Sequence, residues 1–140
     1  MQSQFDLSTA EVFKDDLLAM RVYTSQLLGR DQNLVLHGGG NTSVKIDDVL
    51  YVKGSGWNLD TIEKAGFSPV DLPTLIKMCD YETLSDTDMV SEQRAALKDN
   101  TAPNPSIEAI LHAIIPYTFV DHTHTDAVVT ISNTPQGKAK

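Results

Sequence analysis

Apolar and polar residues near the start of the chain alternate with the period of a helix. The apolar positions that share a spacing near 3.6 residues are Phe13, Leu17, Met20, Leu27 and Leu28. Ser8-Thr9-Ala10-Glu11 precedes them and matches a capping box. The pattern predicts one helix of about 20 residues that begins near Ser8, stops at Gly29 and covers one face of a sheet. Arg21 and the neighbouring charged residues are expected to form its solvated face.

The next stretches have the pattern of short strands. Leu34-Val35-Leu36 predicts one strand. The runs 43–46 and 49–52 are rich in β-branched and aromatic residues and flank Asp47-Asp48. They predict a β-hairpin with its turn at the two acidic residues. Asp60–Gly66 is expected to be a short helical turn.

The second half predicts three helices and a strand. The expected helices are 70–78 with Pro73 in the first turn, 89–97 after the start signal at Ser85, and one with Asn104 as N-cap and Pro105 at its first position. Ile114–Val120 is apolar and predicts a short buried strand. We see no repeat, low-complexity tract or linker that would divide the chain.

Two glycine-rich stretches end at the predicted hairpin. They are His37-Gly38-Gly39-Gly40-Asn41-Thr42-Ser43 and Lys53-Gly54-Ser55-Gly56-Trp57. Since hairpin strands are neighbours, the two loops are expected to meet and to expose backbone amides to an anion. A plain glycine turn is the alternative, and Lys53 adds either charge to the cradle or an edge-strand lysine. No Gly-x-Ser-x-Gly elbow and no Gly-Lys-Ser/Thr ending are present, which excludes a lipase-type oxyanion loop and a P-loop.

His122 and His124 lie two residues apart behind the apolar run, so a strand would place both imidazoles on one face. Two such imidazoles suit a divalent metal such as Zn²⁺, and the alternative is a pair of structural or surface histidines. Glu108 and His112 are spaced i, i+4 on the preceding helix, which brings a carboxylate toward the metal strand. The alternative makes Glu108 a first-turn acid and His112 a surface group. Ser106 would add a hydroxyl at an anion-binding helix start.

Composition narrows the class of protein. The chain has 140 residues, 41% of them hydrophobic and 21% charged, which fits one soluble domain. A formal net charge of −8 disfavours nucleic-acid and anionic-membrane partners. No apolar run reaches the roughly 20 residues of a membrane span, and no secretory signal opens the sequence. Cys79 is the single cysteine, expected in the core, and its lack of a disulfide partner fits a reducing cytoplasm.

These motifs together resemble the class II aldolase/adducin family of zinc-dependent sugar-phosphate aldolases and epimerases. The matching residues, in the family's order and with similar spacing, are Gly39-Gly40-Asn41-Thr42-Ser43, Lys53-Gly54-Ser55-Gly56, Pro105-Ser106-Ile107-Glu108 with His112, and His122-Thr123-His124. The resemblance runs from about residue 10 to the end. Pro-Ser-Ile-Glu and Asp-His-Thr-His look closest to the rhamnulose-phosphate aldolase domain of bifunctional aldolase/dehydrogenase proteins.

The resemblance implies an α/β fold, a three-layer α/β/α domain with a mainly antiparallel central sheet, and a homo-oligomer, usually a tetramer with active sites between subunits. It makes His122 and His124 two of three zinc-binding histidines and Glu108 the catalytic acid/base. The residues that it assigns to the substrate phosphate are Gly40, Asn41, Ser55, Gly56 and Ser106. The implied activity is zinc-dependent retro-aldol cleavage of a phosphorylated ketose. The alternatives are a catalytically silent adducin-like assembly module, or an epimerase or dehydratase on the same scaffold.

The sequence departs from the family at two points. The family's third zinc histidine lies downstream of the His-x-His pair, and no histidine follows His124 here. Ile107 stands where many members have a second serine. Asn133–Lys140 has the pattern of a helix start. We therefore expect residues 1–140 to be one incomplete domain, the N-terminal part of the family fold, with weakened zinc affinity.

Overall fold

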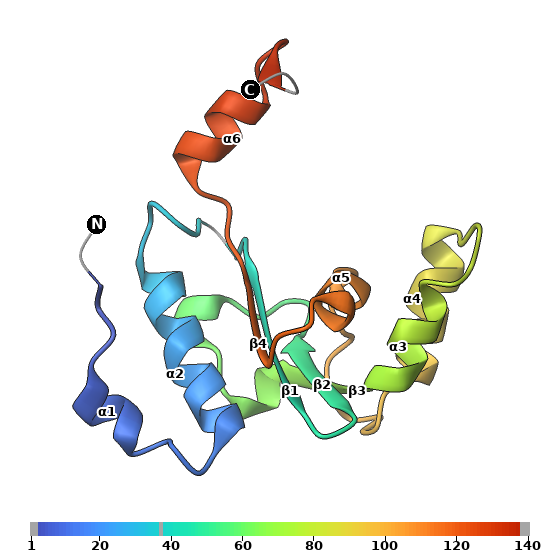
Figure 1. The fold of residues 1–140 in the computed structure, drawn as a ribbon, viewed down its shortest axis with the longest axis horizontal. Coiled ribbons are helices and arrows are strands. Elements are labelled where there is room, and N and C mark those ends of the chain that lie inside the picture. The colour runs from blue at the N-terminus through green and yellow to red at the C-terminus, as the bar shows by residue number, and fades with distance from the viewer. Residues whose placement is uncertain (1–2, 37, 138–140) are drawn as a thin grey trace.

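The computed structural model describes residues 3–36 and 38–137. Its centre is a four-stranded sheet with the order β3-β2-β1-β4 (Figure 1). The strands are β1 (Asn41–Ile46), β2 (Val49–Lys53), β3 (Phe67–Asp71) and β4 (Phe119–His122), and every neighbouring pair is antiparallel. The predicted hairpin is confirmed: Ile46 pairs with Val49, and Asp47 takes the left-handed conformation with φ 50° in the turn.

Helices cover both faces of this sheet. On one side lie α2 (Leu17–Arg30) and the 3-10 turns η1 (Leu59–Thr61) and η2 (Lys64–Gly66); on the other lie α3 (Leu72–Met78) and α5 (Ala109–Ile114), with α4 (Asp86–Ala95) beside α3 (Figure 1). The predicted three-layer α/β/α fold with an antiparallel sheet is confirmed. α6 (Asp126–Ser132) stands away from this body and buries none of its side chains (Figure 1).

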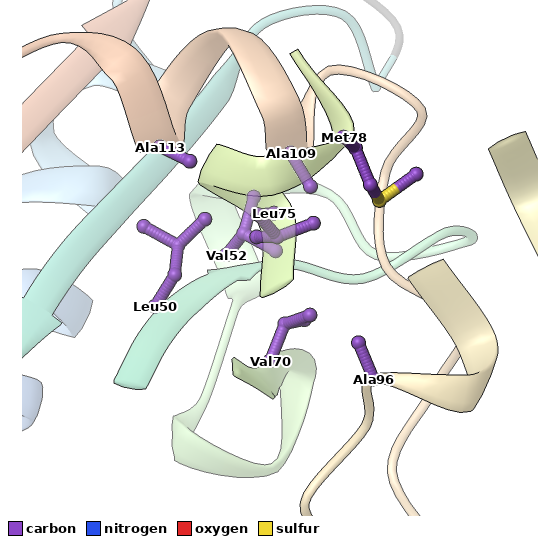
Figure 2. Close-up of a cluster of buried hydrophobic side chains, with 8 residues drawn as sticks. All are labelled: Leu50, Val52, Val70, Leu75, Met78, Ala96, Ala109 and Ala113. Carbon is purple, nitrogen blue, oxygen red and sulfur yellow. The ribbon is translucent and has the colours of Figure 1, made fainter. Parts of the chain in front are cut away.

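The main core lies between the sheet and the helices α3 and α5 (Figure 2). Its buried members are Leu50, Val52, Val70, Leu75, Met78, Ala96, Ala109 and Ala113. Ala109 and Ala113 are one helical turn apart, and their small side chains let α5 lie close to β2. Each fully buried leucine or valine contributes about 1.5–3 kcal/mol relative to exposure. This packing holds α5 against the sheet and thereby fixes the segment just before it.

The single helix predicted from Ser8 to Gly29 is wrong. The chain instead forms α1 (Leu7–Glu11), a turn, and α2. Asp6 caps α1 by accepting from the Thr9 amide, with the Ser8 hydroxyl donating to the same carboxylate at 2.5 Å. Asp16 caps α2 by accepting from the Ala19 amide, so two aspartates start two helices where the capping-box pattern predicts one.

Gly29 does not end α2, which continues to Arg30. A Cβ on Gly29 would come within 2.2 Å of the Asp60 backbone nitrogen, so this glycine allows η1 to pack directly against the helix. Arg21, expected on the solvated face, is buried with 1% of its surface exposed. Cys79, expected in the core, is exposed.

Other boundaries differ because of contacts distant in sequence. No strand forms at Leu34–Leu36; the Leu34 carbonyl accepts from the His124 amide instead. The apolar run 114–120 divides between the end of α5, a bend and the start of β4. Asn133 follows the last residue of α6 and does not start a helix, and residues 138–140 of that predicted helix start lie outside the described residues. By contrast, Pro73 in the first turn of α3 and the start of α4 at Ser85 are confirmed, although residues 70 and 71 belong to β3 and not to the helix.

Among the residues that the structure describes, no helix is both long and apolar enough to cross a membrane.

Candidate metal and substrate site

The predicted site residues gather at one end of the sheet. β1 begins there with Asn41, which pairs with His122 at the end of β4. The end of β2 at Lys53 lies beside the beginning of β1 because the two strands are antiparallel. The segment before α5 reaches the same end through a bridge between Gly54 and Pro105. Four separate stretches of sequence therefore meet around one point.

Glu108, His122 and His124 form the centre of this site. One ligand atom from each lies within 4.8 Å of the other two. The imidazole rings of His122 and His124 are 4.7 Å apart between centroids and inclined by 59°. β4 ends at His122, so the predicted strand alternation does not extend to His124. A hydrogen bond of 2.9 Å from the His124 amide to the Leu34 carbonyl holds it instead.

The carboxylate of Glu108 is half-buried and has two close partners. Asn41 Nδ2 donates to Oε2 at 2.9 Å, and His122 Nδ1 lies 2.8 Å from Oε1. Burial raises the pKa of Glu108, but the Asn41 hydrogen bond and the neighbouring His122 lower it more, and the net shift is downward. Glu108 is therefore ionised at neutral pH, as either a metal ligand or a general base must be.

The His122–Glu108 contact fits a shared cation. Although Nδ1 and Oε1 are close, the approach lacks hydrogen-bond geometry, and Nδ1 is a buried atom without a hydrogen-bond partner among the residues that the structure describes. A nitrogen lone pair facing a carboxylate oxygen at this distance is repulsive unless a proton or a metal ion lies between them. Nitrogen from histidine and oxygen from glutamate are ordinary Zn²⁺ donors. The three side chains therefore suit a divalent metal.

His112 lies between α5 and β1, next to the site. It is fully buried, so the alternative that makes it a surface group is wrong, and its Nδ1 lies 2.8 Å from Ser43 Oγ. Burial lowers the pKa of His112 to about 4, which keeps the ring neutral. Sequence spacing did not single out Ser43 as a partner, because the two residues meet only when α5 packs on β1.

Three of the five predicted phosphate residues come together at the Gly54–Pro105 bridge. The Ser55 amide donates to the Asn104 carbonyl at 2.8 Å, and the Ser106 amide donates to the Lys53 carbonyl at 3.2 Å. Ser55 and Gly56 are exposed beside the half-buried Ser106.

The prediction that Asn104 caps a helix with Pro105 at its first position is wrong. α5 begins only at Ala109, because residues 104–106 pair with the end of β2. Ser106 is thus placed by strand-like pairing, and its hydroxyl accepts from the Glu108 amide at 3.3 Å.

The remaining two phosphate candidates lie closer to the histidines. Asn41 is buried against Glu108. Gly40 has φ 72°, and a Cβ there would be 2.9 Å from the His122 carbonyl oxygen. A Cβ on Gly39 would likewise be 3.2 Å from His124 Nδ1. The first glycine run therefore allows the chain to pack against the histidine segment, whereas the prediction that Gly40 binds phosphate stays a prediction. His37 lies outside the described residues.

Lys53 is not an edge-strand lysine. β2 lies between β1 and β3, and Lys53 is buried near the end of that strand. Burial lowers the pKa of Lys53, and the charge of Glu108 acts in the opposite direction. The Lys53 side chain therefore lies close enough to Glu108 for the two groups to interact at this end of the sheet.

Residues 20–139 match the family described as Class II Aldolase and Adducin N-terminal domain. The "Uncharacterized oxidoreductase YuxG" of Bacillus subtilis (strain 168) is 38% identical over 126 residues, which cover 84% of this chain and 18% of that protein. The solved "N-terminal Class II Aldolase domain of a conserved protein from Thermoplasma acidophilum" superimposes with a TM-score of 0.86 and 38% identity, covering 96% of this chain and 65% of that one. The chain thus spans less than two thirds of either protein.

Proposed function

The chain belongs to the class II aldolase and adducin N-terminal domain family, and from this premise we propose that it carries the catalytic residues of a metal-dependent aldolase that cleaves a phosphorylated ketose. The observation that carries the proposal is the group formed by Glu108, His122 and His124, with ligand atoms within 4.8 Å of one another. An assembly module has no need to hold a carboxylate 2.8 Å from a histidine nitrogen without hydrogen-bond geometry.

His122 and His124 would hold the metal, with Glu108 close enough to act as a further ligand or as the base. A divalent metal, when bound, supplies a Lewis acid that stabilises negative charge developing on substrate oxygens. The half-buried carboxylate of Glu108 stays ionised through the Asn41 hydrogen bond and the neighbouring His122. Asn41 also fixes the direction of the carboxylate, which leaves Oε1 on the side of the histidines.

Retro-aldol cleavage needs one proton to leave and one to arrive. The hydroxyl on the carbon beyond the scissile bond loses its proton, and that fragment departs as an aldehyde. The electron pair of the carbon–carbon bond passes to the carbonyl fragment as an enediolate, whose carbon then takes a proton. Glu108 is the base that we assign to this proton transfer, since a positioned carboxylate near the reacting carbons serves both directions.

The exposed loop at Ser55 and Gly56, together with Ser106, would bind the substrate phosphate. Backbone amides and hydroxyls are suitable donors, and Lys53 adds positive charge nearby. Binding at this remote group would orient the reacting carbons at the metal.

The experiment that tests the function joins metal content to turnover. Purified protein should contain one zinc, cobalt or manganese ion per chain, and the His122→Ala/His124→Ala variant should contain none. Wild-type protein should then cleave at least one member of a panel of ketose phosphates. Metal without cleavage, but with inversion or loss of water on the same panel, would favour the epimerase or dehydratase alternative. Protein that binds no metal would favour the assembly module.

We include homo-oligomerisation in the proposal. Ile76, Ile114 and Tyr117 are exposed large apolar residues that line one surface hollow between α3 and the end of α5. A second copy would cover such a face, and sedimentation of Ile114→Glu beside wild type would test it.

A further inference from the structure

Arg21 is a buried arginine on the opposite face of the sheet from the candidate site. Only 1% of its surface is exposed, and it lies in the second turn of α2. Burying a guanidinium is costly unless every donor finds a partner, and an apolar residue of similar size is often as stable. The contacts of this side chain therefore indicate what it does.

The guanidinium connects α2 to both strands of the β1–β4 pair. Nη1 donates to the carbonyl of Ser43 at 3.3 Å and to that of Val120 at 3.5 Å. Ser43 and Val120 are register partners on these two strands. Nη2 lies 2.7 Å from Asp121 Oδ1, and the cation also lies 5.5 Å from the ring centroid of Phe119. One side chain thus contacts three successive residues of β4.

Its remaining donors are held by its own helix. Nε donates to Ser25 Oγ at 3.1 Å, and Nη2 donates to Thr24 Oγ1 at 2.7 Å. Ser25 is in turn 2.8 Å from Thr42 Oγ1 on β1. These contacts within α2 therefore fix the orientation of the guanidinium relative to the helix.

β4 needs such an anchor. It is an edge strand with four residues, and within the described part of the chain it pairs with β1 alone. The ends of short edge strands open easily. Asp121 points to the α2 side, and the next residue, His122, points to the side of Glu108 and Asn41. An ion pair at Asp121 thus holds the strand backbone directly before His122.

We infer that Arg21, through Ser43, Val120 and Asp121, is a positioning residue that sets the location of His122 relative to Glu108. This inference rests on the proposed metal site, but its subject is the placement of an imidazole, which is measurable without metal.

The test compares Arg21→Lys and Asp121→Asn with wild type and with Arg30→Lys. Arg30 is an exposed arginine on the same helix whose side chain bonds only Gln26 among the described contacts, so it controls for the chemical change itself. Co²⁺ titration followed by visible absorption gives the affinity and the ligand geometry. Side-chain nitrogen spectra of the metal-free protein report the His122 and His124 rings separately.

We expect Arg21→Lys and Asp121→Asn to weaken Co²⁺ binding about 10-fold or more and to change its spectrum, as loss of supporting contacts does at metal sites. Arg30→Lys should match wild type. In the metal-free site variants, the ring-nitrogen chemical shifts of His122 should differ from those of wild type. The shifts of His124, whose amide is bonded to the Leu34 carbonyl, should differ less. The double variant should bind no more weakly than the worse single variant.

If folded Asp121→Asn has the Co²⁺ affinity and the His122 chemical shifts of wild type, the inference is overturned. Because Asp121 is half-exposed, this variant can be tested even if Arg21→Lys does not fold. If wild type binds no Co²⁺, the metal-dependent function fails. The metal-free His122 signals then decide the positioning role: movement in the two site variants supports it, and no movement overturns it.

Discussion

Glu108 and His122 face each other from different parts of the chain, with Oε1 2.8 Å from Nδ1. The core packing of α5 brings the first residue to this point, and the pairing of β4 with β1 brings the second. Asn41, the register partner of His122, donates to the other carboxylate oxygen. The register of the sheet and the packing of α5 therefore together determine the Glu108–His122 contact on which the proposed chemistry depends.

Glu108→Gln should abolish most turnover while the protein stays folded. The amide keeps the shape and can still accept from Asn41, but it cannot take a proton. We expect kcat for ketose-phosphate cleavage to fall about 10²- to 10⁴-fold, the usual contribution of a general base. Glu82→Gln, which changes an exposed glutamate, is the matched control. A Glu108→Gln variant with kcat near that of wild type would remove Glu108 from the role of base.

His112 should make the metal-free protein less stable as pH falls from about 6.5. Burial lowers its folded-state pKa from 6.5 to about 4, so between these values the unfolded state binds more protons and the free energy of unfolding decreases with falling pH. The slope reaches at most about 1.4 kcal/mol per pH unit. Denaturant unfolding between about pH 5 and 6.5, above the range in which carboxylates usually titrate, should show this slope. The slope should be smaller in His112→Asn. An equal slope in both proteins would mean that His112 is charged in the folded state.

The sequence pattern predicted those parts of the fold whose signals are local. The hairpin at Asp47-Asp48, Pro73 in the first turn of α3 and the helix start at Ser85 are predicted correctly from local residues, whereas the three-layer class follows from the family resemblance. Spacing and resemblance indicate Glu108, His122 and His124 as candidate residues, and the structure places them together. Their roles stay predictions.

The failures come from contacts distant in sequence. Asn104-Pro105 matches the sequence of a helix start, but because Pro105 forms a bridge with Gly54, α5 begins only at Ala109. The charge of Arg21 predicts a solvated position, and only the assembled sheet supplies the carbonyls that let it be buried. Neither partner set can be read from helical or strand periodicity, since it depends on which elements become neighbours.

Ser55→Ala and Ser106→Ala should weaken binding of the phosphate group selectively. The loops carrying these hydroxyls lie side by side through the Gly54–Pro105 bridge. Loss of one hydrogen bond to a charged group costs about 1.5–3 kcal/mol, which corresponds to a rise in KM of roughly 10- to 100-fold. KM for the unphosphorylated ketose should not change. The control is Ser91→Ala on the exposed part of α4. Equal effects on both substrates would place the phosphate elsewhere.

Gly54→Ala should be more harmful than Gly56→Ala, although the two glycines belong to one loop. A Cβ on Gly54 would lie 2.4 and 2.7 Å from two ring carbons of Pro103, which cannot move aside by rotation. The overpacking should cost about 1–3 kcal/mol in the free energy of unfolding. No atom of the described residues lies within 4 Å of a Cβ on Gly56, so only its φ of 85° opposes a side chain, at about 1–2 kcal/mol.

The two variants also differ in their expected effect on the site. Gly54→Ala should separate the two phosphate loops by disturbing the bridge to Pro105, and should raise KM for the phosphorylated ketose together with the loss of stability. Gly56→Ala changes the exposed surface of the loop and leaves the bridge intact, so KM should rise with the smaller stability loss. Denaturant unfolding and substrate kinetics on the same preparations distinguish these cases. If Gly54→Ala keeps wild-type stability and KM, the bridge does not hold Ser55 beside Ser106 in solution, and the phosphate assignment loses its structural basis.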